Sequence, residues 1–160
     1  MRDFDSDIRR LGDHWDAAAA GAIIGDLVTA VWQAGGPDQR MQGHASAIRR
    51  MVNDRLAGGP SPAERLELLN IAYSLEQGMG NRDQALLIAE QAEQLSRTAG
   101  SRLDRVRALF QYAKALLYVN RNTDAVEWTR RGLRLGDEVD QSAELGEADR
   151  QSLRGLLADQ

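Results

Sequence analysis

The residues that could perform acid–base or metal chemistry are two histidines and scattered carboxylates. His14 and His44 each lie in a polar, helix-like context, and a shared metal site would need further carboxylates brought in by the fold. Aspartates alternate over residues 3–7 as at the start of a calcium loop, but Ile8 stands where that loop needs glycine and the closing glutamate is absent. We therefore expect no metal site and interpret both histidines as surface or packing residues.

Other catalytic signatures are missing from the sequence. It contains no glycine-rich phosphate loop, nucleophile elbow or zinc-peptidase motif, and no cysteine that could act as a thiol nucleophile or form a disulfide. The acidic residues Asp137, Glu138 and Asp140 lie in an expected loop without a partner acid in an apolar pocket. The sequence therefore predicts a non-enzymatic protein with no catalytic residue and no cofactor.

The charge balance bears on nucleic acid as a partner. A net charge of −4 over 160 residues argues against a domain that binds nucleic acid through its overall field. A basic patch at Arg130, Arg131 and Arg134 is compatible with phosphate contacts, but no recognition-helix pattern or series of stacking aromatic residues accompanies it. The sequence disfavours a nucleic-acid partner.

Residues 102–135 indicate which helices would position the charged side chains of this region. The first half has the apolar spacing of three and four that is typical of an amphipathic helix, at Val106, Leu109, Phe110, Ala113, Leu116 and Leu117. The polar run 120–123 interrupts this rhythm, and Asn122 or Thr123 is suited to cap the next helix. Small residues such as Gly132 on that second helix favour two helices lying close together.

The same two-helix unit returns at a step of 40 residues. At this step Ala125 matches Ala85 and Ala45, and Trp128 matches Ile88 and Ile48. Such a period points to stacked helical pairs, in which each pair hides its apolar face against a neighbour. Coincidence in an alanine-rich chain is the alternative, and the repetition of the turn residues together with the apolar positions favours a true repeat.

These residues resemble the tetratricopeptide repeat family. Residues 80–85 (Gly-Asn-Arg-Asp-Gln-Ala) look like that family's turn into its second helix, and Ala85, Ala89 and Ala92 match its small positions there. Residues 120–125 and Gly132 fit the same pattern in the next copy, so that the similarity covers about residues 64–136.

The sequence departs from this family in three ways. The period is 40 rather than about 34 residues, the proline between repeats is missing, and Leu69 or Leu109 stands where the family has tryptophan. Longer helices or linkers would explain the period, as in the longer-repeat relatives found in bacterial regulators. A HEAT-like pair, with a period of about 40–47 residues, is the alternative. It is less favoured because the two turns inside the pairs are so short and so alike.

The resemblance implies an all-α fold of antiparallel helix-pair repeats, stacked as a short right-handed α-solenoid with a C-terminal capping helix. We expect one domain over residues 1–160, with a divergent first pair at 1–59, a second pair at 61–99, a third at 101–138 and a capping helix at 141–158. Within the first pair, residues 1–35 are predicted to form one long helix, or two with a bend. The spacing Gly21-x-x-x-Gly25 predicts close packing against a neighbouring helix.

Capping signals divide the rest of the chain. Asp38 follows Gly-Gly-Pro and can begin a helix, and Ser61 precedes Pro62 with Glu64 three residues on. Ser101 follows Ala-Gly, and Asp104 can support it as a cap. These signals predict helices over residues 39–57, 62–78, 82–98 and from about 102.

In the family that this chain resembles, the first helices of the pairs line a concave surface that holds a ligand. The positions that this implies for a protein or peptide partner are Asn70, Ser74, Gln77, Arg107, Phe110, Lys114, Tyr118, Arg150 and Arg154. Arginine and lysine can hold a carboxylate while aromatic rings supply apolar area, a combination suited to an acidic peptide. The alternative is a solvated helix face with ordinary ion pairs, such as Asp104 with Arg107.

The function expected from these features is that of a protein- or peptide-binding adaptor. The alternatives are a regulatory or sensor domain associated with a transcriptional regulator, and a secretion-type chaperone. We expect a cytoplasmic protein without membrane insertion, because no signal peptide is present and the apolar run 17–32 is too short to span a bilayer. Exposed apolar surface around Trp15 or Trp32 could also support a homo-oligomer.

Overall fold

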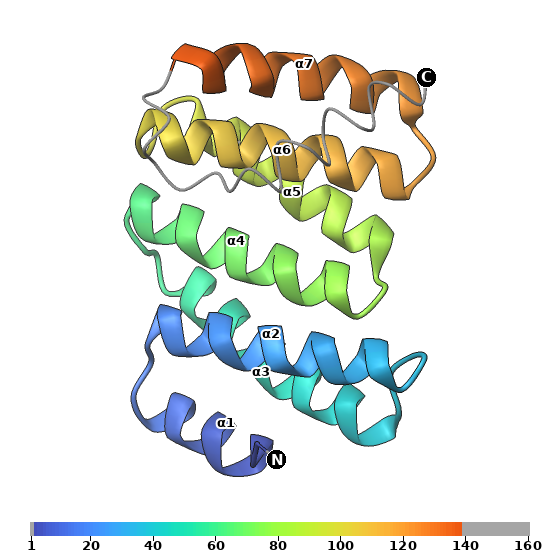
Figure 1. The fold of residues 1–160 in the computed structure, drawn as a ribbon. Helices are drawn as coiled ribbons and strands as arrows, with labels where there is room; N and C mark the ends of the chain where they lie inside the picture. Colours follow the sequence, from blue (N-terminus) through green and yellow to red (C-terminus); the bar gives the residue numbers. More distant parts are fainter. Residues whose placement is uncertain (1, 139–160) are drawn as a thin grey trace. The chain divides into compact units, whose positions relative to one another are not determined.

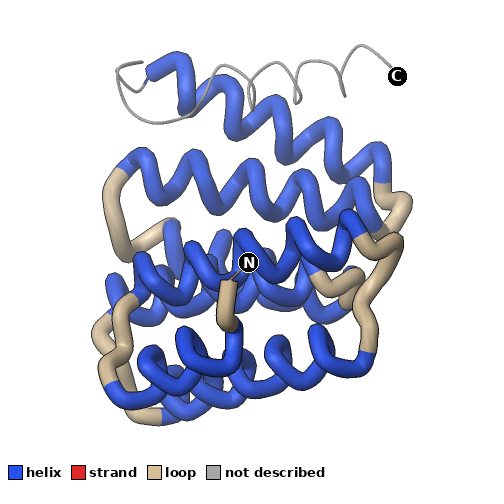
Figure 2. Tube along the Cα trace, turned by 60° about the horizontal axis from the view of Figure 1, so that its bottom comes forward, coloured by secondary structure: helices blue, strands red, loops and turns tan. Residues whose placement is uncertain are grey.

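The computed structural model describes residues 2–138, which form seven helices and no strand (Figures 1 and 2). The helices are α1 (Phe4–Asp13), α2 (Ala17–Gln33), α3 (Gln39–Ala57), α4 (Pro62–Gly78), α5 (Arg82–Ser96), α6 (Arg102–Tyr118) and α7 (Asn122–Glu138). The predicted all-α class is confirmed for this part of the chain. The predicted capping helix at 141–158 lies outside the described residues. The chain divides into two compact units, Met1–Ile88 and Ala89–Gln160, and the division falls within α5.

The helices begin where the capping residues predict. The side chain of Asp38 accepts the N–H of Met41 at 2.8 Å, and that of Ser61 accepts the N–H of Glu64 at 3.3 Å. At α6 the capping box is complete, because Ser101 and Asp104 each bind the other's backbone N–H. Each such cap satisfies N–H groups that a helix start leaves unpaired, and contributes about 1 kcal/mol.

The helices α2, α4 and α6 end with the same hydrogen-bonding pattern. In each, an N–H beyond the helix reaches the carbonyl oxygen five residues back, from Gly36 to Val31, Asn81 to Glu76 and Arg121 to Leu116. The residue before each of these donors has a positive φ: Gly35, Gly80 and Asn120. This is the Schellman type of helix end, and it turns the chain into the next helix within a few residues.

The start of α7 differs from the prediction. The helix already includes Asn122, so neither Asn122 nor Thr123 caps it from outside. Instead the carbonyl of Arg121 accepts the N–H of Ala125 at 3.0 Å, and the Arg121 guanidinium pairs with Asp124 at 2.7 Å. The acidic side chain in the first turn, rather than a cap, complements the helix dipole here.

The predicted step of 40 residues holds between the second and third helix pairs. The helices α4 and α6 begin at residues 62 and 102, and α5 and α7 begin at 82 and 122. The first pair, α2 and α3, begins at residues 17 and 39 and is therefore offset from that step. Ala45, Ala85 and Ala125, which the step relates, are all buried.

In the first unit, α4 packs against both α2 and α3, and α1 packs across α2 and α3. The side chains buried most completely include Ile24 and Leu27 of α2, Ile48 of α3 and Leu75 of α4. Gly78 on α4 makes the closest approach, because a Cβ atom there would lie 2.1 Å from a methyl group of Val28 on α2. A glycine at this position allows the C-terminal ends of α2 and α4 to lie side by side (Figure 1).

The N-terminal region contradicts the expected role of its paired glycines. Residues 4–33 form two helices, α1 and α2, separated at residues 14–16. Gly21 and Gly25 are exposed, and a Cβ atom at either position would have open space around it. The buried face of α2 is instead the one that carries Ile23, Ile24 and Leu27, so the predicted close packing at the two glycines is wrong.

In the second unit, α6 packs against α7 over most of its length. Val106 and Phe110 of α6 form an apolar cluster with Leu133 and Leu135 of α7. The rings of Tyr112 and Trp128 meet edge to face, with centroids 4.8 Å apart, a favourable arrangement for aromatic quadrupoles. Within residues 2–138, no helix combines the length and the apolar character needed to cross a bilayer.

Candidate binding surfaces

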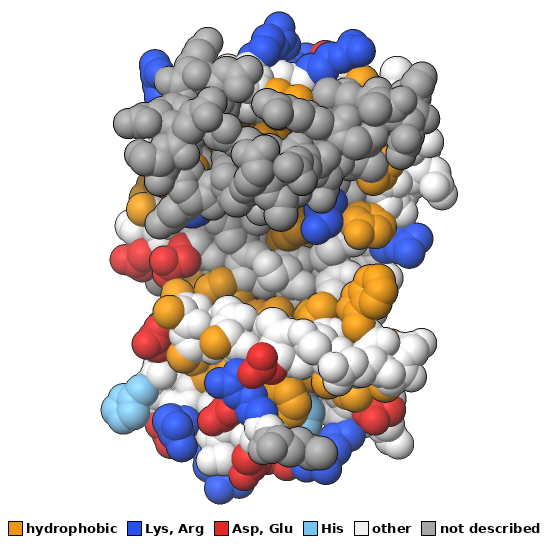
Figure 3. Space-filling view, viewed as in Figure 1, with side chains coloured by type: hydrophobic (Ala, Val, Ile, Leu, Met, Phe, Trp, Pro, Cys, Tyr) orange, Lys and Arg blue, Asp and Glu red, His pale blue; other side chains and the backbone are white. Residues whose placement is uncertain are grey.

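The largest exposed aromatic side chain of the first unit lies on α2, near the place where α2 packs against α4. Trp32, near the C-terminal end of α2, is 80% exposed. It lies one helical turn beyond Val28, whose side chain contacts Gly78 of α4. In the space-filling view, side chains over α2 are mostly hydrophobic or uncharged, whereas charged groups gather over α1 (Figure 3). This face therefore offers apolar area beside the neighbouring helix α4.

The three site residues predicted on α4 share one stripe of that helix. Asn70, Ser74 and Gln77 are spaced by four and three residues, which places them on the same face. The hydroxyl of Ser74 donates to the carbonyl oxygen of Asn70 at 3.1 Å. The side-chain oxygens of Asn70 and Gln77 are buried, and no donor from the described part of the chain reaches them. Both amides therefore retain unused hydrogen-bonding capacity, which is uncommon in folded proteins.

The site residues predicted on α6 are divided between surface and core. Lys114 and Tyr118 are exposed, and Arg107 is half-buried. Phe110 is buried, because its ring lies against Gly132 of α7 within the apolar cluster. The α6 surface therefore offers a lysine and a tyrosine, while Phe110 contributes to the packing of α6 on α7. Arg150 and Arg154 lie outside the described residues.

The basic patch of α7 is only partly available to an anion. Arg131 pairs with Glu127, and its guanidinium also stacks 4.3 Å from the centre of the Trp128 ring. Arg130 and Arg134 are exposed and lie one helical turn apart. The patch therefore presents two cations to solvent, and the third is engaged within the helix.

Two buried glutamates outside the predicted site are held by arginines. Glu76 of α4 is 5% exposed and accepts Nε of Arg49 at 2.8 Å and Nδ2 of Asn81 at 3.3 Å. Arg49 and Glu76 also line a pocket of about 220 Å³ between α3, α4 and α5. Because a buried carboxylate is costly without partners, these bonds fix α3, α4 and the following turn.

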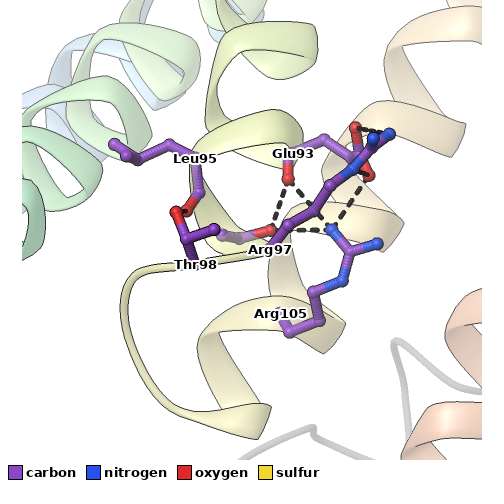
Figure 4. Close-up of polar contacts among 6 residues, drawn as sticks. Glu93, Leu95, Arg97, Thr98 and Arg105 are labelled. Carbon is purple, nitrogen blue, oxygen red and sulfur yellow. Dashed lines mark hydrogen bonds and ion pairs between the residues drawn. The ribbon is translucent and has the colours of Figure 1, made fainter.

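The second buried glutamate is Glu93 of α5, which is 1% exposed. Figure 4 shows the polar contacts that Arg97 and Arg105 make with it. Arg97 binds it through two nitrogens, at 3.0 and 2.9 Å. Arg105 of α6 uses one nitrogen to reach the Glu93 carboxylate, the Glu93 carbonyl and the Ser96 hydroxyl, at 2.9, 2.9 and 3.0 Å. The hydrogen bonds from Arg97 to Glu93 raise the pKa of its guanidinium. The network holds the end of α5 to the start of α6 and is structural in character.

The comparisons with known proteins give no assignment: no family model and no curated protein matches this chain.

Proposed function

We propose that this chain is a non-enzymatic scaffold that binds a protein or peptide on the exposed face of its helix pairs, built as a tetratricopeptide-like α-solenoid. The observation that supports this most directly is the 80% exposure of Trp32 on α2. Tryptophan is enriched among the residues that dominate binding energy in protein interfaces. A ring left in water on a folded helix is therefore a natural anchor for a partner.

The polar stripe of α4 provides the second element of this surface. The amide oxygens of Asn70 and Gln77 have no donor from the described residues. The terminal torsion of an amide side chain is broad, so a small rotation would turn each oxygen toward an N–H group of a bound chain. Trp32 would then supply apolar contact area while α4 supplies hydrogen bonds, a division typical of protein interfaces.

The cations of α6 provide a separate point of attachment for an acidic partner. Lys114 is exposed and Arg107 half-buried, and the two lie about two helical turns apart on α6. Charges at the rim of an interface act mainly on the rate of association and on specificity. We therefore assign the anchoring role on the first unit to Trp32, and on the second unit we assign the selection of acidic partners to α6.

The test is affinity capture of the tagged full chain from its own host, with identification of the bound proteins. Capture of a specific protein by the unaltered chain should be lost with Trp32→Ala, because truncating an interface anchor typically costs about 2 kcal/mol or more. Leu87→Ala is the matched control, since Leu87 is also an exposed apolar residue, 54% exposed, but lies on α5. Equal capture by both variants would exclude Trp32 as the anchor.

A double variant, Arg107→Glu with Lys114→Glu, tests the preference for acidic partners separately. Capture should weaken and lose its dependence on salt concentration, while circular dichroism reports an unchanged fold. Unchanged capture would remove α6 from the binding surface. Sedimentation of the unaltered chain and of Trp32→Ala distinguishes self-association from binding to another protein.

A further inference from the structure

A pocket of about 450 Å³ lies between α1 and α2 in the first unit, away from the α4 stripe. Its apolar wall is formed by Leu11 of α1 and by Ala19 and Ile23 of α2. The volume falls within the range of about 300–1,000 Å³ that is typical of small-molecule sites. The pocket therefore has room for a small organic molecule with an apolar body.

The change of chain direction at residues 14–16, between α1 and α2, creates this pocket. His14 ends α1 in an extended conformation, and Asp16 caps the start of α2, so that Trp15 lies between the two helices. The guanidinium of Arg55 on α3 lies over the Trp15 ring, 4.7 Å from the ring centre. Both His14 and Trp15 line the pocket, which places an aromatic ring at its edge.

Most of the charges that line the pocket are already neutralised by the protein. Arg2 binds Asp7 at 2.7 Å and also pairs with Asp26, and the hydrogen bond that Arg2 donates to Asp7 is the main reason why the pKa of Arg2 is raised. One carboxylate oxygen of Asp16 accepts the N–H groups of Ala18 and Ala19, at 2.9 and 3.2 Å. These carboxylates are therefore poor partners for a bound cation.

Arg10 is the exception among the charged groups of the pocket. Its nearest carboxylate, Asp7, lies 3.9 Å away and is shared with Arg2, and the Arg10 side chain is 75% exposed. The planar guanidinium presents donors in a geometry that matches a carboxylate. Arg10 thus lies at the edge of the apolar wall and, within the described part of the chain, its side chain forms only this long ion pair with Asp7.

From this arrangement we propose that the α1–α2 pocket binds a small monocarboxylic acid, with the carboxylate on Arg10 and the apolar body between the Trp15 ring and the wall of Leu11, Ala19 and Ile23. The acid is favoured over an amine because Asp7 and Asp16 accept hydrogen bonds from within the protein, while the Arg10 side chain forms only the 3.9 Å ion pair with Asp7 among residues 2–138. This site is independent of the protein-binding surface proposed above.

The test uses cyclohexanecarboxylate as the probe, added to the full, isotopically labelled chain and followed by nuclear magnetic resonance. Saturable shifts are expected at the indole N–H of Trp15 and the backbone N–H of Ala19. The uncharged cyclohexanecarboxamide and the cationic cyclohexylmethylamine should each bind at least about fivefold more weakly, the size of a partly exposed ion pair. Absent or non-saturable shifts, or equal binding of the amine, would overturn the proposal.

Two variants on α1 test which arginine binds the carboxylate of the probe. Arg10→Gln should weaken cyclohexanecarboxylate binding by about fivefold or more. Arg9→Gln should leave it unchanged, because Arg9 is an exposed neighbour on α1 that does not line the pocket. Both positions are on the surface, so the fold should be retained. Equal binding by the two variants would overturn the assignment of Arg10.

Discussion

Gly132 of α7 lies directly against the ring of Phe110 on α6. A Cβ atom at Gly132 would be 2.7 Å from Cε1 and 2.8 Å from Cδ1 of the ring, which is closer than real Cβ contacts allow. The ring belongs to the apolar cluster with Val106, so it cannot turn aside without disturbing its neighbours. The spacing of α6 and α7 is therefore set by the absence of a side chain at this position.

Gly132→Ala should destabilise the second unit by about 1 kcal/mol, and by no more than about 2 kcal/mol. Overpacking a core typically costs about 1–3 kcal/mol, which exceeds the gain of about 1 kcal/mol from replacing a helical glycine. Urea unfolding followed by circular dichroism measures the change. Gly25→Ala is the control: that glycine is helical but has open space around its Cβ position, so the same substitution should stabilise. A stabilised Gly132→Ala would refute the close contact.

The contact between Gly78 and Val28 can be tested as a coupled pair. Gly78→Ala should destabilise the first unit, because the new methyl group would meet the Val28 side chain at 2.1 Å. Val28→Ala removes the opposing methyl groups, so the double variant should be more stable than the sum of the two single effects predicts. An interaction free energy of about 0.5–3 kcal/mol is expected for residues in contact. Additive effects on urea unfolding would show that α2 and α4 do not meet here.

The parts of the fold that the sequence predicts are those with local signals. The starts of α3, α4 and α6 follow from Asp38, Ser61 and Ser101, because capping depends on residues within one turn. The 40-residue step between the second and third pairs can also be predicted, because apolar periodicity and turn residues are local signals. The role of Gly21 and Gly25 is not local: spacing identifies small residues on a helix, but packing partners decide which face is buried.

The candidate surface is less predictable for the same reason. Phe110 fits both a ligand-facing stripe and a core stripe by spacing, and only the position of α7 places it in the core. Trp32 is of a residue type that is usually largely buried, so its exposure cannot be read from composition. The α1–α2 pocket depends on the elbow at residues 14–16, where no glycine or proline marks a break.

The two arginines that bind Glu93 should differ in their contribution to stability. Arg105→Met should destabilise by about 2–3 kcal/mol, because it removes bonds to the Glu93 carboxylate, the Glu93 carbonyl and Ser96 around a charge that stays buried. Arg97→Met should have a clearly smaller effect, since the Arg97 side chain is 55% exposed and water can replace part of its contact. Urea unfolding of both variants gives the comparison. A larger loss for Arg97→Met would contradict the assignment of Arg105 as the main partner.

The phenol of Tyr112 should titrate above its ordinary pKa of about 10. Burial is the main cause, and the nearby carboxylate of Glu90 adds to it, because both disfavour the phenolate. The folded state then binds more protons than the unfolded state above pH 10. The stabilisation from this residue is therefore complete below about pH 10 and is lost as the pH rises through the pKa of the folded state.

Urea unfolding of the unaltered chain and Tyr112→Phe should show a stability difference that shrinks as the medium becomes more alkaline. Phenolate absorbance that reports ionisation of Tyr112 at or below pH 10 in the folded protein would contradict the prediction.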